Sequence, residues 1–195
     1  MKRAFDLIAS IIGIILLIPL FVVIWILVIS ESPGDGFYRQ QRVGKNGKDF
    51  GLLKFRTMHT GSDKKGLLTV GGRDPRVTRV GFYLRKYKLD ELPQLFNVLT
   101  GEMSLVGPRP EVRKYVNLYN TSQLRVLDIK PGITDYASIE FSNENEILGR
   151  AANPETIYIE EIMPKKLELN LKYIAEQSMW TDLKIIFRTV IKILN

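Results

Sequence analysis

The residues best suited to chemistry are two adjacent carboxylates, Asp90 and Glu91, which are followed by Pro93. Asp often precedes the first turn of a helix, and Pro is tolerated within that turn. We therefore expect a helix from Asp90 to about Leu99, stopped by Gly101. A helix N-terminus stabilises negative charge, which keeps Asp90 ionised and able to act as a nucleophile. Simple capping of the helix by Asp90 is the structural alternative.

Two carboxylates side by side repel unless a cation lies between them. Mg²⁺, held by a carboxylate such as Glu91 and by substrate phosphates, resolves that conflict. Further positive charge for phosphate oxygens is available from Lys54, Arg85 and Arg109, since Arg binds phosphate with a two-pronged fork and Lys as a point charge. An acidic pair, a metal ion and several cations together favour phosphoryl chemistry.

The elements that carry these cations begin with a β-hairpin. The sequence predicts strands over residues 37–43 and 49–58, joined by a turn at Asn46-Gly47, a dipeptide that adopts positive φ readily. Side chains alternate along a strand, so Lys54 and Arg56 share one face and point together at whatever lies over it. A solvated strand face is the alternative.

The other two cations lie on a helix and in a rigid turn. Helical spacing predicts a basic helix over residues 76–89, which carries Arg85, and two prolines fix the backbone around Arg109 in Gly107-Pro108-Arg109-Pro110. A further helix is expected near residues 111–127. Residues 59–74 are rich in Gly, Lys and Asp and predict a mobile loop, in which the single histidine, His59, is a loop residue rather than a catalytic base.

The N-terminal segment is apolar enough for a membrane. Residues 7–29 contain no charge and span about 34 Å as a straight helix, enough to cross a bilayer. No signal-peptidase pattern follows, so we expect a retained helix. Pro19 interrupts it, and basic residues flank both ends, so a re-entrant helix that enters and leaves by the same face is our hypothesis against simple spanning.

Composition narrows the class of protein. The chain has 195 residues, 28 Lys and Arg against 21 Asp and Glu, one His and no Cys. These counts exclude a disulfide framework, a thiolate zinc site and a multi-histidine site, and they fit a reducing cytosolic face. The basic balance favours anionic partners. We expect residues 1–30 to form the membrane helix, with a break near Pro19, and residues 31–195 to form one catalytic domain.

The C-terminal segment predicts an amphipathic helix over residues 182–195. One stripe is apolar and another basic, as in a helix lying in a membrane interface. A surface helix with its apolar stripe packed on the core is the alternative. The apolar stripe consists of Leu183, Ile186, Phe187, Val190 and Leu194.

Six short motifs in this order make the chain recognisable. They are Lys2-Arg3-x-Phe5-Asp6, Lys54-Phe55-Arg56-Thr57-Met58, Asp74-Pro75-Arg76-Val77-Thr78, Leu89-Asp90-Glu91-Leu92-Pro93-Gln94-Leu95, Val106-Gly107-Pro108-Arg109-Pro110-Glu111 and Pro131-Gly132-Ile133-Thr134. Together they resemble the bacterial sugar transferases, the monotopic phosphoglycosyl transferase family, over nearly the whole chain.

The resemblance implies transfer of a sugar phosphate from a nucleotide sugar, usually a UDP-sugar, to a polyprenol phosphate such as undecaprenyl phosphate, with release of UMP. It implies a helix-rich α+β fold: a re-entrant membrane helix, a small β-hairpin and amphipathic interfacial helices around a compact catalytic domain. The protein would lie in the bacterial inner membrane, with this domain on the cytosolic face. Membrane lipid is an expected partner, nucleic acid is not, and a homo-oligomer is left open.

The resemblance also assigns roles. By similarity, Asp90 attacks the sugar-linked phosphate to form a covalent phosphosugar intermediate, and Glu91 helps to hold Mg²⁺. Lys54, Arg85 and Arg109 match site cations that bind substrate, and Asp182 matches an acidic residue that the family places near the site.

Residues 135–142 depart from the family pattern. Ser142 stands where many members have Arg, while Asp135 and Glu140 add negative charge; Arg150 is a candidate to compensate. The sequence therefore does not name the sugar.

Two other functions fit the residues less completely. A membrane-anchored basic module that binds anionic lipid or nucleic acid leaves the pair Asp90 and Glu91 unexplained. A hydrolase, in which water resolves an aspartyl intermediate, leaves the apolar anchor without a purpose.

Overall fold

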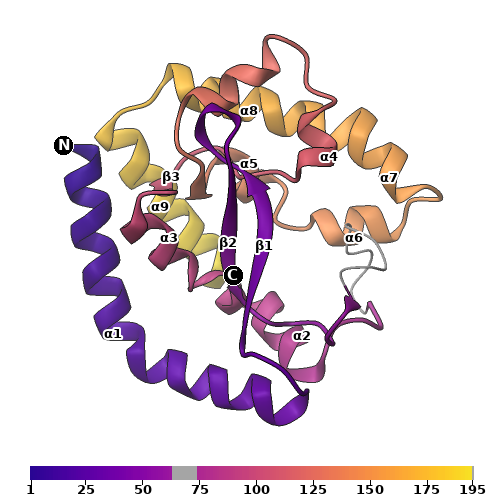
Figure 1. The fold of residues 1–195 in the computed structure, drawn as a ribbon. Helices are drawn as coiled ribbons and strands as arrows, with labels where there is room; N and C mark the ends of the chain where they lie inside the picture. The colour runs from indigo at the N-terminus through magenta and orange to yellow at the C-terminus, as the bar shows by residue number, and fades with distance from the viewer. Residues whose placement is uncertain (63–73, 195) are drawn as a thin grey trace.

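The computed structural model describes residues 1–62 and 74–194. Its first helix, α1 (Lys2–Glu31), is not straight, and Figure 1 shows it running away from the N-terminus and then turning along the lower edge of the molecule. Pro19 lies inside α1. Proline cannot donate to the carbonyl four residues earlier, here that of Ile15, and its ring crowds that oxygen. We therefore assign the bend to Pro19.

Both ends of α1 are bound to the rest of the chain. Near the start, Lys2 Nζ donates to Asp182 Oδ2 at 2.5 Å. At the far end, the Glu31 carboxylate accepts from the backbone N–H groups of Arg79 and Val80 at 2.7 and 2.8 Å. The two ends of this long apolar helix are thus held on the same body.

Much of the apolar surface of α1 is uncovered. Phe21, Ile24 and Val28 pack against Phe55 and Leu84 in a shared core. Within the described residues, α1 is the helix long and apolar enough to cross a membrane. Apolar surface of this extent on a helix of this length indicates a membrane protein. The exposed side chains are Ile8, Ile11, Ile12, Ile15, Leu16, Ile18, Val22, Val23, Trp25, Ile26 and Leu27.

The β-hairpin is confirmed. Strand β1 (Phe37–Val43) pairs antiparallel with β2 (Asp49–Phe55), and the connecting turn η1 (Lys45–Gly47) has positive φ at Asn46 and Gly47, as expected. The second strand ends at Phe55 rather than residue 58. Its next residue, Arg56, turns away and donates to the carbonyls of Ser32 and Asp35, so it holds the chain that leaves α1.

The predicted boundary at Asp90 is wrong. Helix α2 (Arg79–Lys86) is capped by the Thr78 side chain, a 3-10 turn η3 (Leu89–Glu91) follows, and α3 (Gln94–Thr100) begins after Pro93. Pro93 precedes α3 without a side-chain capping bond, and Asp90 lies inside the preceding turn. The capping role that sequence gave as the alternative for Asp90 is therefore absent, and its carboxylate is left for other uses. Gly101, in the left-handed region, ends α3 as expected.

A parallel pair of short strands supports the turn that holds Arg109. Strand β3 (Ser104–Val106) pairs with β4 (Gly132–Thr134). The backbones approach so closely beyond β3 that a Cβ on Gly132 would lie 2.0 Å from the nitrogen of Gly107. Only glycine fits there, so the chain enters the Pro108-Arg109-Pro110 turn from a fixed position.

The single helix expected near residues 111–127 is wrong. The structure has a short α4 (Arg113–Val116) and a 3-10 segment η4 (Gln123–Asp128). Between them, the Asn120 carboxamide accepts from Ser122 Oγ and from the Gln123 backbone N–H. Asn side chains that bond to nearby backbone in this way favour turns over helices.

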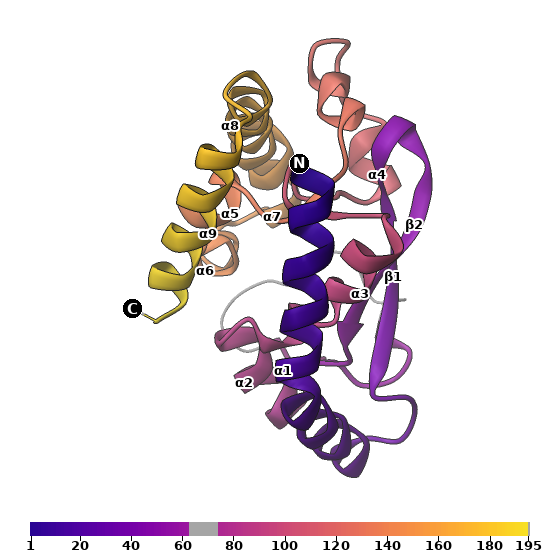
Figure 2. The ribbon, with the colours of Figure 1, turned by 90° about the vertical axis from the view of Figure 1, so that its left-hand side faces the viewer.

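The remaining helices form the other side of the molecule. They are α5 (Tyr136–Glu140), α6 (Glu144–Gly149), α7 (Pro154–Ile157), the π-helical turn η5 (Tyr158–Ile162), α8 (Met163–Ala175) and α9 (Met179–Leu194). Figure 2 shows α8 and α9 on one side of α1 and the hairpin on the other. A core around Leu148, Tyr158 and Leu167 joins α4, α6 and α8. The fold is helix-rich α+β, as expected.

Helix α9 turns part of its apolar stripe outward, while Ile186 packs against the core around Tyr173 and Ile185. Ile185 and Asp182 are buried, whereas Leu183, Phe187 and Val190 are exposed, Phe187 to 68%. The alternative of a stripe packed on the core therefore fails for these three residues. Of the loop expected over residues 59–74, residues 63–73 lie outside those that the structure describes.

Candidate active site

Asp90 is a buried carboxylate without a full set of donors. Its residue is 6% exposed, and Oδ1 has no hydrogen-bond partner among the described residues. Burial, and then the neighbouring charge of Glu91, raise the pKa of Asp90 to about 6. Below neutral pH this carboxyl gains a proton readily, and above pH 6 it is an ionised, poorly solvated oxygen nucleophile.

Glu91 has the opposite environment. Arg109 Nη1 donates to Glu91 Oε2 at 3.0 Å, Arg109 Nη2 donates to Oε1, and Lys54 Nζ lies 3.8 Å from Oε1. Burial alone would raise the pKa of Glu91, but the charges of Arg109 and Lys54 outweigh it and hold that pKa well below its usual range. Two adjacent carboxyls with pKa values pushed apart indicate different roles.

Lys54 and Arg85 add charge at the same place. Burial lowers the pKa of Lys54 to about 8, although the Glu91 carboxylate opposes that shift. Arg85, in the last turn of α2, is close enough to Asp90 that each stabilises the charged form of the other. The structure thus brings together Asp90, Glu91, Lys54, Arg85 and Arg109, five of the six residues proposed from the sequence.

Asp182, the sixth residue, lies elsewhere. It is fully buried on α9, where it accepts from Lys2 Nζ and from the Tyr173 hydroxyl at 2.7 Å. It does not line the cleft that contains Asp90. In this structure its contacts fasten the start of α1 to α9.

Asp135 positions Arg109, a role that the sequence did not reveal. Its Oδ2 accepts from the Arg109 backbone N–H at 3.1 Å, and its Oδ1 accepts from the Ser138 N–H at 2.6 Å and so caps α5. The sequence alone indicates only that Asp135 adds a negative charge. An Asp directly before a helix was the available signal for the cap, but no sequence pattern points to Arg109, 26 residues away.

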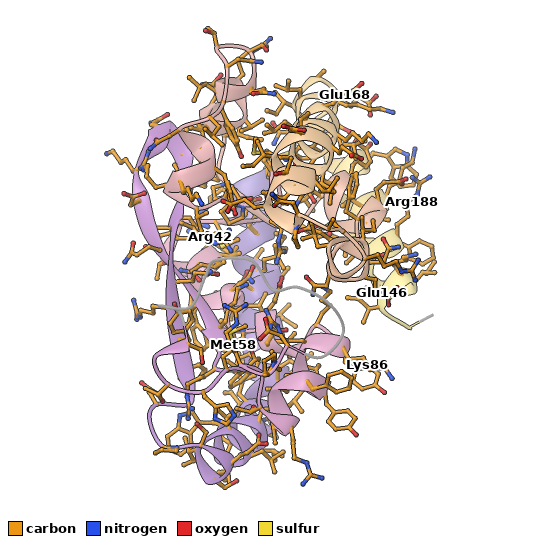
Figure 3. All side chains as sticks on the ribbon, turned by 90° about the vertical axis from the view of Figure 1, so that its right-hand side faces the viewer. Arg42, Met58, Lys86, Glu146, Glu168 and Arg188 are labelled. Carbon is orange, nitrogen blue, oxygen red and sulfur yellow. The ribbon has the colours of Figure 1, made fainter. Side chains whose placement is uncertain are left out.

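The five residues line one large cleft of about 1590 Å³. Its walls come from the hairpin and η3 on one side and from α5, α6 and α8 on the other. Figure 3 labels Arg42, Met58 and Glu146, three residues of this lining, and shows Glu146 across from the other two. A cleft of this size holds a ligand with several chemical parts.

The same cleft contains a second hydrogen-bond network, around Glu111, that sequence reasoning did not predict. Arg42 Nη1 donates to Glu111 Oε1 at 2.8 Å, and the Tyr158 hydroxyl donates to Glu111 Oε2. Ser142 lines the cleft, but Arg150, expected to compensate for the missing arginine, is exposed and lies outside the lining. Arg150 therefore does not take the place of that arginine.

The donor set fits Mg²⁺. Proteins hold this ion with one or two carboxylates together with substrate phosphates. Glu91 would hold the ion with an oxygen that now accepts from Arg109, and the unpartnered oxygen of Asp90 would stay available for attack. Within the described ranges no cluster of three or more His, Cys, Asp or Glu side chains exists, so substrate oxygens would complete the coordination.

Comparison with known proteins adds a family and named relatives. Residues 1–195 match the family described as bacterial sugar transferase. The chain is 39% identical over 198 residues to the UDP-N-acetylgalactosamine-undecaprenyl-phosphate N-acetylgalactosaminephosphotransferase of Aeromonas hydrophila, covering 100% of this chain and 44% of the relative. It is 40% identical over 196 residues to the UDP-glucose:undecaprenyl-phosphate glucose-1-phosphate transferase of Escherichia coli K12, covering 98% of this chain and 40% of the relative.

A shorter relative matches over more of its own length. The UDP-glucose:undecaprenyl-phosphate glucose-1-phosphate transferase of Caulobacter vibrioides is 37% identical over 197 residues, which are 100% of this chain and 70% of that protein. The chain thus spans less than half the length of the first two relatives and more than two thirds of the third.

Proposed function

The chain belongs to the family of bacterial sugar transferases, and from that premise we propose that it moves a sugar 1-phosphate from a UDP-sugar to undecaprenyl phosphate. The observation that carries this proposal is the pair Asp90 and Glu91: one carboxylate has an oxygen without a donor, and the other is held by Arg109. Such a transfer is the first membrane step in building a glycoconjugate.

The reaction consists of two displacements at one phosphorus. An Asp90 oxygen attacks the sugar-linked phosphorus, the bond from that phosphorus to the bridging oxygen breaks, and UMP leaves with the electron pair. An oxygen of undecaprenyl phosphate then attacks the same phosphorus and expels the Asp90 carboxylate. The products are undecaprenyl diphosphate sugar and the free enzyme, so atoms and charges balance.

The surrounding residues prepare the carboxylate and the phosphates. Asp90 is buried, so few water molecules solvate its oxygen and it is a better nucleophile. Lys54, Arg85 and Arg109 supply the positive charge that phosphate oxygens need during attack. Mg²⁺ held by Glu91, when bound, would supply further charge to the same oxygens.

We also propose that α1 is re-entrant and that the catalytic domain lies on the cytosolic face of the inner membrane. The bend of α1 and the attachment of both its ends to one body support this topology, because a crossing helix would separate Lys2 from Asp182. The exposed Leu183, Phe187 and Val190 of α9 and the basic residues beside them support a position in the membrane interface.

The experiment uses the purified chain in lipid nanodiscs, UDP-glucose or UDP-N-acetylgalactosamine, and Mg²⁺, with and without undecaprenyl phosphate. The proposal predicts UMP release that depends on the acceptor and a sugar-linked lipid product. UMP release that is equal without acceptor would instead indicate a hydrolase. A lack of turnover with every UDP-sugar would favour a non-catalytic membrane module.

A further inference from the structure

Besides Asp90 Oδ1, two further side-chain oxygens in the cleft have no hydrogen-bond partner among the described residues. Asn170 on α8 is 4% exposed, and its Oδ1 has no hydrogen-bond partner among the residues described. Ser138 on α5 has a buried Oγ that likewise lacks a partner there. Both residues line the cleft that contains Asp90, and α5 packs against α8. The two atoms therefore belong to one wall.

Asn170 is out of place among its neighbours on α8. Leu167 and Met163, one and two turns earlier on the same face, are apolar and part of the core. A buried amide whose oxygen has no partner among the described residues is unfavourable there, so Leu or Met would serve the packing better. A ligand that enters the cleft and bonds to the amide accounts for Asn170.

This wall is linked to the reacting carboxylates by a short series of contacts. The Asp135 carboxylate accepts hydrogen bonds from the backbone N–H groups of both Arg109 and Ser138. The Arg109 side chain in turn donates to both oxygens of Glu91. Ser138 is thus fixed relative to the residues that surround the phosphorus. In the proposed reaction the sugar is joined to that phosphorus through a single oxygen, whereas the uridine lies beyond a second phosphate, so we expect the sugar rather than the uridine to meet this wall.

The chemistry of the wall fits a neutral, hydroxyl-bearing ligand. The charged residues beside Asn170 neutralise each other, because Lys166 Nζ donates to Glu144 Oε2 at 2.7 Å. Phosphate is better bound by Lys54, Arg85 and Arg109. An amide and a hydroxyl can both donate and accept, which matches the ring substituents of a sugar.

We propose that Ser138 and Asn170 form the subsite that recognises the sugar ring of the UDP-sugar and sets which sugar is transferred. This inference rests on the proposed function. Recognition by buried polar groups discriminates strongly, because a sugar that cannot complete the bonds leaves both atoms unpaired.

The test compares kcat/KM for UDP-glucose, UDP-galactose and their two N-acetylhexosamine counterparts. For Asn170→Ala and Ser138→Ala we expect the ratio between the preferred sugar and its nearest analogue to fall by about tenfold, which is the effect of one lost hydrogen bond at the upper end of its range. Inhibition by UMP, which carries no sugar, should stay within about twofold of the wild type. Asn117→Ala, at an exposed position outside the cleft, is the matched control and should change neither quantity.

Two results would overturn the subsite. In the first, kcat/KM of the two variants falls equally for all four UDP-sugars. In the second, inhibition by UMP weakens together with kcat/KM, which would assign Ser138 and Asn170 to binding of the nucleotide. Ser138→Ala removes a single oxygen and keeps the test decisive if Asn170→Ala does not fold. If the wild-type chain releases no UMP from any UDP-sugar, the proposed function is overturned as well. If the wild type is active but Asn170→Ala and Ser138→Ala keep its ratios of kcat/KM between sugars, only the subsite is overturned.

Discussion

The Arg109 guanidinium grips both oxygens of the Glu91 carboxylate and leaves the adjacent carboxylate, Asp90, with one oxygen that has no donor among the described residues. Neighbours in sequence thereby differ in chemistry: Glu91 stays ionised across the physiological range, while Asp90 titrates near pH 6. A carboxylate whose bonds are already satisfied is a poor nucleophile, so the arrangement favours Asp90 for attack and Glu91 for holding charge.

The pH profile of kcat/KM should be bell-shaped. Asp90 attacks only when ionised, so the rate should fall as the pH drops through about 6, the raised pKa of that carboxyl. Lys54 binds phosphate only when protonated, so the rate should fall again as the pH rises through about 8, its lowered pKa. Initial rates of UMP release between pH 5 and pH 9.5, chosen to bracket both values, measure the two limbs.

The variant Lys54→Arg tests whether Lys54 causes the alkaline limb of the pH profile. A guanidinium stays charged throughout this range, so the alkaline limb should disappear while the acid limb keeps its position. If the alkaline limb is unchanged in Lys54→Arg, another group is responsible for it.

Removal of metal should stop the reaction, and Glu91→Gln should raise the Mg²⁺ concentration needed for half-maximal rate by about tenfold or more. A neutral amide is a weaker ligand for a hard cation than a carboxylate. The measurement is a Mg²⁺ titration of UMP release after treatment with EDTA, with Glu102→Gln as a control outside the cleft lining. Full wild-type activity in excess EDTA would refute the metal role.

Lys2, near the N-terminus, should contribute to the free energy of unfolding through its ion pair with Asp182. Lys2→Met leaves the buried Asp182 carboxylate without its cation, which should lower the free energy of unfolding by about 3 kcal/mol. Asp182→Asn in the same chain should restore part of that loss, because the charge is removed as well. Thermal unfolding in detergent measures both, with Lys48→Met, at an exposed position, as the control. Equal stability of Lys2→Met and Lys48→Met would contradict the anchoring role.

Single cysteines test the topology in a chain that has none of its own. Ala4→Cys and Lys45→Cys place a thiol at exposed positions on either side of the apolar stretch and spare Lys2. A re-entrant helix protects both thiols from a membrane-impermeant reagent in intact cells, and both react after lysis. Labelling of position 4 from outside would show a crossing helix. Pro19→Leu, which restores the helical hydrogen bond, should shift the protein toward that state.

The sequence predicted well those features that depend on local rules. Asn46-Gly47 specifies its turn, the apolar run specifies α1, and Gly101 ends α3. The chemistry of phosphate and the family motifs also place Asp90 together with Glu91, Lys54, Arg85 and Arg109. Helix boundaries were predicted less well: the turn at Asn120 divides residues 111–127, expected to form one helix, into α4 and η4.

Long-range partnerships could not be predicted. Nothing in the sequence near residue 182 indicates that Asp182 binds Lys2, because the chain between them must fold first. The same applies to Asp135, whose second oxygen accepts from Arg109, and to Arg56, which shares a strand alternation with Lys54 but binds the loop after α1 instead. Contacts of this kind depend on tertiary packing rather than on local pattern.

The nucleophilic role of Asp90 is central to the proposed reaction, and trapping the covalent intermediate tests that role directly. With a UDP-sugar and Mg²⁺ but no acceptor lipid, mass spectrometry of the digested protein should find one phosphosugar on the peptide that contains Asp90. Asp90→Asn should carry no label and show no turnover. It should fold at least as stably as the wild type at neutral pH, because the raised pKa of Asp90 means that its ionised form opposes folding above pH 6. A label on any other peptide, or wild-type turnover by Asp90→Asn, would show that Asp90 is not the nucleophile.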